Sequence, residues 1–144
     1  MEDLNCIVYV SSAIRPLAVP ELEALLVSAR QFNDEVGVTG VLLYHDGTFF
    51  QYFEGPTEGV TQVYARIRAS RSHHAIYELL NTKIKARLFP NWLMGASNVT
   101  SSLLLNLARA EWHASIQQVA DLPEVPNEGL ALLTSYWKSC GYGP

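Results

Sequence analysis

The chain has 144 residues, 49% of them apolar, which suits one domain with a core of its own. Its net charge is −4 with only ten basic residues, which argues against a nucleic-acid partner. No apolar run reaches the roughly 18 residues that a membrane helix needs, and the start has no signal-peptide core. We therefore expect a cytoplasmic protein without a membrane partner.

Two short basic clusters, at 66–71 and 83–87, fit a solvated face or a small anion such as a phosphate. Cys6 and Cys140 lie at opposite ends of the chain and show no metal-binding or redox spacing. We expect both thiols to be free.

The first predicted strand runs from Leu4 to Ser11, where β-forming residues alternate between two faces. The face that carries Tyr9 also carries Asn5, Ile7 and Ser11. Tyr9 is therefore predicted to point away from Leu4 and the other residues of the opposite face.

The first predicted helix begins at Pro20, because a proline in the first turn loses no hydrogen bond, and Gly37 ends it. Asn33 follows Ala29 by one helical turn, so its amide lies on or beside the apolar stripe. The apolar residues that form this stripe are Leu22, Leu25, Leu26, Ala29 and Phe32.

A hairpin follows, with strands predicted over 38–44 and 48–54 and an Asp46-Gly47 turn signal between them. Gln51 lies mid-strand between Phe49 and Phe53, where an apolar residue is expected. A buried amide without partners costs about 1–3 kcal/mol, so Gln51 needs hydrogen-bond partners.

A second amphipathic helix follows Thr57, a candidate N-cap, and further strands are predicted over 75–84 and 93–99. The β-α-β-β-α-β-β order predicts an α+β, ferredoxin-like sheet with both helices on one face. Helices over 101–118 and 128–139 would cover the open face or carry a partner surface. We expect one domain at 1–99 and a helical extension at 100–144 packed on the same domain.

Three polar side chains converge in one layer if both helices cover one face of the sheet: Tyr9, Asn33 and Gln51. A phenol can donate to a glutamine oxygen while the amide nitrogen donates elsewhere. This set lacks an acid or base, so it fits a flat heteroaromatic ligand better than hydrolysis. Spacing alone leaves open a structural amide at Gln51, a core tyrosine at Tyr9 and a chain-reversal role for Asn33.

Other chemistry is poorly supported by the residue patterns. The pair His73-His74 has no third or fourth metal ligand at fitting spacing, and no glycine-rich phosphate loop follows a strand. The serine pairs lack the context of a catalytic nucleophile. We therefore expect no metal, no catalytic set and no enzyme activity.

Several segments, taken in order and at their intervals, resemble the BLUF family, the sensors of blue light using FAD. They extend over residues 4–99 and are VYVSSA at 8–13, SARQFN at 28–33, GVTGVLLY at 37–44, GTFFQYFEG at 47–55, RI at 66–67, RSH at 71–73 and RLFPNWLM at 87–94.

The resemblance implies that the isoalloxazine ring of FAD lies between the two helices of a ferredoxin-like domain, and FMN or riboflavin can also load. Tyr9 and Gln51 match the photoactive pair: Tyr9 supplies an electron and a proton, and Gln51 rotates or tautomerises to give a red shift. Trp92 and Met94 match the residues that relay the signal. The implied flavin contacts are Tyr9, Leu26, Asn33, Gln51, Arg66, Ile67, Ser70 and His73.

Three positions depart from the family pattern: Phe32 stands where Asn or His is frequent, Ser70 where Asp is usual and Ser72 where Arg is frequent. These changes alter contacts at the flavin edge and leave the Tyr9–Gln51 pair intact. No effector enzyme fits after residue 99, so we expect output through a protein partner or a homo-oligomer. The alternatives are a light-insensitive interaction module and a small ferredoxin-like hydrolase.

Overall fold

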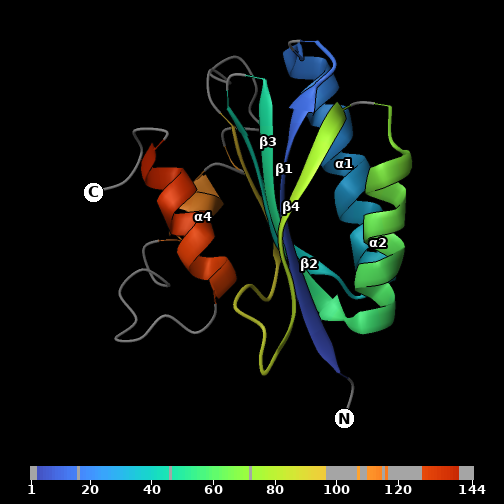
Figure 1. Cartoon of the computed structure of the whole chain (residues 1–144). Coiled ribbons are helices and arrows are strands. Elements are labelled where there is room, and N and C mark those ends of the chain that lie inside the picture. The colour runs from blue at the N-terminus through green and yellow to red at the C-terminus, as the bar shows by residue number, and fades with distance from the viewer. Residues whose placement is uncertain are drawn as a thin grey trace.

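The computed structural model describes residues 3–15, 17–45, 47–71, 73–96, 107, 110–114, 116 and 128–139, with the side chains of 94–96 and 137 outside that description. Helices cover both faces of a central sheet, with α1 and α2 on one side and α4 on the other (Figure 1). The elements are β1 (Leu4–Ala13), α1 (Val19–Glu35), β2 (Thr39–His45), β3 (Thr48–Pro56), α2 (Thr57–Ala69), β4 (His73–Ile84), β5 (Trp92–Ala96) and α4 (Glu128–Ser139).

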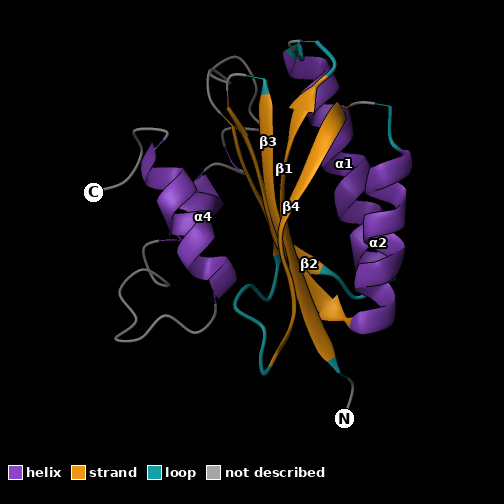
Figure 2. Ribbon diagram, viewed as in Figure 1, coloured by secondary structure: helices purple, strands orange, loops and turns teal. Residues whose placement is uncertain are grey.

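The sheet has the strand order β4-β1-β3-β2-β5, and every neighbouring pair is antiparallel except β2 with β5. The first four strands and the two helices α1 and α2 form the predicted ferredoxin-like α+β unit (Figure 2). Strand β5 extends the sheet beside β2. Gly40 on β2 has a φ of 150°, and a Cβ there would lie 2.1 Å from the carbonyl oxygen of Tyr52. Only glycine allows the two strands to approach this closely.

Two hydrophobic cores follow from the alternation of side chains along the strands. The core under α1 and α2 contains Ile7, Tyr9 and Phe53, and the core on the opposite face contains Cys6 and Val8. The predicted faces of the first strand are therefore confirmed. The second core also receives Trp112, Leu130 and Leu133, so the C-terminal helical segments cover the sheet face that α1 and α2 leave open.

Several element boundaries differ from the sequence predictions. Thr57 is not an N-cap: Pro56 occupies that position, and Thr57 begins the helix with its hydroxyl donating to the side-chain oxygen of Asn5 at 2.8 Å. The prediction was wrong because Asn5, 52 residues away, competes for the hydroxyl. β4 begins at His73, two residues earlier than predicted, and is bulged against β1.

The C-terminal helix predicted over 128–139 is confirmed as α4. Of the helix predicted over 101–118, residues 107, 110–114 and 116 are helical, and the rest lie outside the described residues, as do Asp46 and Ser72. No described helix combines the length and apolar character needed to cross a membrane.

Candidate functional site

A cavity of about 440 Å³ lies between α1, α2 and the sheet. That volume is in the range of sites for small organic ligands. Leu26 is fully buried in the core and is not part of the wall, whereas its neighbour Leu25 lines it. The other predicted contact residues all line the cavity: Tyr9, Asn33, Gln51, Arg66, Ile67, Ser70 and His73.

Tyr9 and Gln51 form the polar centre of the cavity. They lie opposite each other on β1 and β3, and the hydroxyl of Tyr9 donates to Oε1 of Gln51. Both side chains are buried. Burial, followed by the proximity of Tyr64, raises the pKa of the Tyr9 hydroxyl far above its usual value, so the phenol stays protonated and remains a donor.

Two buried amides face the cavity with unused hydrogen-bonding capacity. Within the described residues, the side-chain nitrogen of Gln51 and the side-chain amide of Asn33 have no protein partner. Asn33 also stabilises the turn that follows α1, because its backbone carbonyl accepts hydrogen bonds from the amides of Val36 and Val38 at 3.2 and 2.9 Å. The pyrimidine edge of a flavin offers alternating donors and acceptors, so the residues present fit this group.

His73 connects the end of α2 to β1 beside Tyr9. Its Nε2 lies 3.0 Å from the carbonyl oxygen of Ile67, which can only accept, so Nε2 carries the proton. Burial lowers the pKa of His73, so the ring is neutral and Nδ1 accepts from the Ser11 hydroxyl at 2.6 Å. The face predicted for Ser11 was correct, but its role at the site had no sequence signal because its partner lies 62 residues away.

Arg66 connects the two helices at the edge of the cavity. Its Nη2 donates to the Ser28 hydroxyl at 2.7 Å, and its guanidinium carbon lies 4.4 Å from the centroid of the Phe32 ring. Phe32, one of the departures from the family pattern, therefore supports Arg66 by a cation–π contact. Another wall residue, Glu21, is neutralised by Arg15 at 2.7 Å.

The two predicted relay residues are on β5, outside the cavity wall. Trp92 is buried in the core under α1 and α2, and its indole N–H has no partner among the described residues. The backbone of Met94 pairs with Leu42 on β2, while the Met94 side chain lies outside the described set.

Glu54 is a buried carboxylate on the opposite sheet face that sequence reasoning did not single out. It accepts from the Tyr52 hydroxyl at 2.8 Å and from the backbone amides of Leu88 and Phe89 at 2.8 and 2.6 Å. Burial raises its pKa, while these donors oppose the shift. Glu54 thus anchors the segment that leads into β5.

The family model described as sensors of blue-light using FAD matches residues 4–95. The photoactivated adenylate cyclase subunit beta of Euglena longa is 32% identical over 87 residues, which is 60% of this chain and 10% of that protein. The blue light- and temperature-regulated antirepressor BluF of Escherichia coli (strain K12) is 35% identical over 86 residues, 60% of this chain and 21% of that protein. The chain thus spans a small part of the length of both curated relatives.

Solved structures show the same fold. The dark-state structure of BlrB, a BLUF protein, has a TM-score of 0.65 and 27% identity over 82% of this chain and 98% of that one. A bacterial light-regulated adenylyl cyclase has a TM-score of 0.64 and 30% identity over 80% of this chain and 34% of that one.

Proposed function

The chain belongs to the BLUF family, the sensors of blue light using FAD, and on that premise we propose that its cavity holds the isoalloxazine ring with Tyr9 and Gln51 as the light-responsive pair. The proposal rests on the hydrogen bonding of the Gln51 side-chain amide. Its oxygen accepts from Tyr9, while its nitrogen faces the cavity without a protein partner.

A bound flavin absorbs blue light and, once excited, supplies the oxidising power to draw an electron from a nearby phenol. Tyr9 is the phenol in the wall, and its proton already lies in a hydrogen bond to Oε1 of Gln51. Movement of that proton and its return would leave the Gln51 amide rotated or tautomerised. The amide would then present a different group to the ligand. The arrangements before and after this change are the two states of the proposed switch.

The remaining wall residues are proposed to bind and orient the flavin. The Asn33 amide pairs with the polar edge of the ring, and Arg66 is the basic residue among the described wall residues that can meet a phosphate on the flavin tail. Ile67, Ser70 and His73 shape the wall, and Leu26 supports it from the layer beneath.

Output is proposed to pass through β5 and the C-terminal helical extension at 100–144. Trp92 packs in the same core as Tyr9, and Trp112 packs in the core on the other face. The region that matches the family is a sensor without catalytic function of its own. A protein partner or a homo-oligomer would receive the signal.

One experiment tests the function directly. The purified protein should be yellow, and blue light should cause a reversible red shift of the flavin absorbance. A colourless protein would support the light-insensitive interaction module instead. Yellow colour without the shift would indicate a flavin protein that does not sense light.

A further inference from the structure

A second tyrosine lies beside Tyr9. The ring centroids of Tyr9 and Tyr64 are 6.3 Å apart and the rings are tilted by 30°. Tyr64, on α2, is 7% exposed, and the Phe53 ring lies about equally close to both tyrosines, at 6.2 and 6.0 Å. An electron lost from Tyr9 could therefore be replaced from Tyr64 across packed aromatic rings.

Two features distinguish these phenols. Tyr9 donates its proton to Gln51, whereas no side chain in the described part of the chain accepts the proton of Tyr64. Above Tyr64 lies the guanidinium carbon of Arg68, 4.2 Å from the ring centroid. A cation is attracted to the face of a neutral aromatic ring and is repelled once that ring becomes positive.

We propose that Arg68 confines light-driven electron loss to Tyr9 by making Tyr64 a poor electron donor. The inference rests on the proposed function, because the oxidant is the photoexcited flavin. In the reaction that Arg68 suppresses, oxidised Tyr9, still holding its proton, takes one electron from Tyr64. Tyr9 is restored, the phenolic proton of Tyr64 leaves to water, and Tyr64 remains as a neutral radical. The hydrogen-bond change at Gln51 is then not completed.

Glu78 moderates this effect. Its Oε1 lies 3.9 Å from Nη2 of Arg68, and both side chains are substantially exposed. Solvent and this carboxylate weaken the field of Arg68, so the cation acts mainly through its direct contact with the ring.

A double-mutant cycle in the flavin-loaded protein tests the inference. After a blue flash, Arg68→Gln should lower the yield of the red-shifted state about twofold or more and give a long-lived tyrosyl radical in the electron paramagnetic resonance spectrum. Tyr64→Phe should behave as the wild type. The double variant should recover the wild-type yield, because the competing donor is gone.

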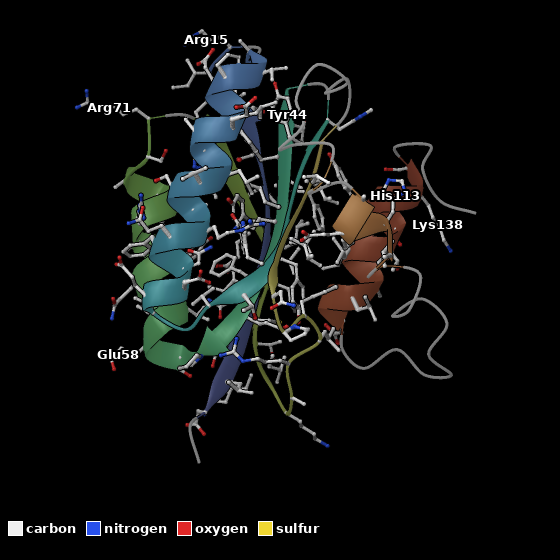
Figure 3. The ribbon with its side chains drawn as sticks, turned by 180° about the vertical axis from the view of Figure 1, so that it is seen from behind. Arg15, Tyr44, Glu58, Arg71, His113 and Lys138 are labelled. Carbon is white, nitrogen blue, oxygen red and sulfur yellow. The ribbon has the colours of Figure 1, made fainter. Side chains whose placement is uncertain are left out.

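Arg71→Gln is the matched control, since Arg71 is an arginine that extends into solvent at the end of α2 (Figure 3). It should leave yield and radical signal unchanged. Wild-type behaviour of Arg68→Gln, or loss of yield in Tyr64→Phe, would overturn the inference. A wild type without any red shift would instead overturn the proposed function, and this inference with it.

A dark measurement on the flavin-loaded protein tests the contact separately. With ¹³C-labelled tyrosine Cζ, Arg68→Gln should move the NMR signal of Tyr64 and leave that of Tyr9 in place. An unmoved Tyr64 signal would mean that the guanidinium does not lie over the ring in solution, which would also overturn the inference.

Discussion

Tyr9 and Gln51 are register partners on adjacent antiparallel strands, and the hydroxyl of the first donates to the side-chain oxygen of the second. Opposite residues in antiparallel strands share a face, so the sheet itself sets their separation. The backbone atoms of both residues are held in the sheet. A fixed backbone suits the proposed switch, in which the Gln51 amide rotates or tautomerises on a rigid support.

Gln51→Leu should abolish the red shift while flavin still binds. Leucine fills a similar space but can neither accept from Tyr9 nor donate into the cavity. The buried Tyr9 hydroxyl then lacks this partner, which should lower the free energy of unfolding by about 1–3 kcal/mol. Absorbance spectra before and after blue light check the first effect, and urea titration checks the second. A normal photocycle in this variant would exclude Gln51 as the switch.

Tyr9→Phe should block formation of the normal light state. The ring can keep its edge contact with Phe53, at 6.2 Å between centroids, but the proton that moves toward Gln51 is lost. Flavin should still bind because the cavity keeps its shape. Flash spectroscopy is the readout, and an unchanged yield of the red-shifted state would contradict the assigned electron and proton donor.

His73 should make the protein less stable in mild acid. Burial lowers its pKa in the folded state, so the unfolded chain, with a pKa of about 6.5, binds the proton more readily. Stability contributed by neutral His73 is present above that value and is lost as pH falls from about 6.5 through the lower folded pKa. The difference in unfolding free energy between the wild type and His73→Gln should therefore shrink with falling pH. A difference that is constant across this window would rule out the assigned neutral state.

Glu54→Ala should destabilise the fold by about 3 kcal/mol or more, because it leaves the buried amides of Leu88 and Phe89 without their acceptor. Tyr52→Phe is the matched control: it removes one donor to the same carboxylate and should cost only about 1 kcal/mol. Chemical denaturation measures both. Equal losses would show that the backbone contacts of Glu54 contribute little.

Ala75→Gly should raise the free energy of unfolding by about 1 kcal/mol. Ala75, at the bulge of β4, has a φ of 54°, a conformation that glycine adopts without the penalty of a Cβ. The same change at Ala65, an exposed position inside α2, should lower stability by a similar amount. Thermal melts of both variants check the opposite signs, and a lower melting temperature for Ala75→Gly would contradict the prediction.

Residue patterns alone were enough to predict the element order and the faces of the main strands. Alternation along the first strand placed Tyr9 opposite the Cys6 face, and the same rule placed Gln51 with Phe49 and Phe53. These predictions succeeded because side-chain direction in a strand is a local property of the backbone. The family motifs, found in order along the sequence, added the prediction that the ligand is a flavin. Residue spacing alone left the identity of the ligand open.

The polar groups that meet could be identified from the three-dimensional fold alone. The Ser11–His73 and Glu54–Phe89 hydrogen bonds join residues that lie 62 and 35 positions apart in the sequence. Such pairs depend on strand register, bulges and the docking of helices on the sheet. Those are set by the packing of the whole core, so no local pattern of residues specifies them.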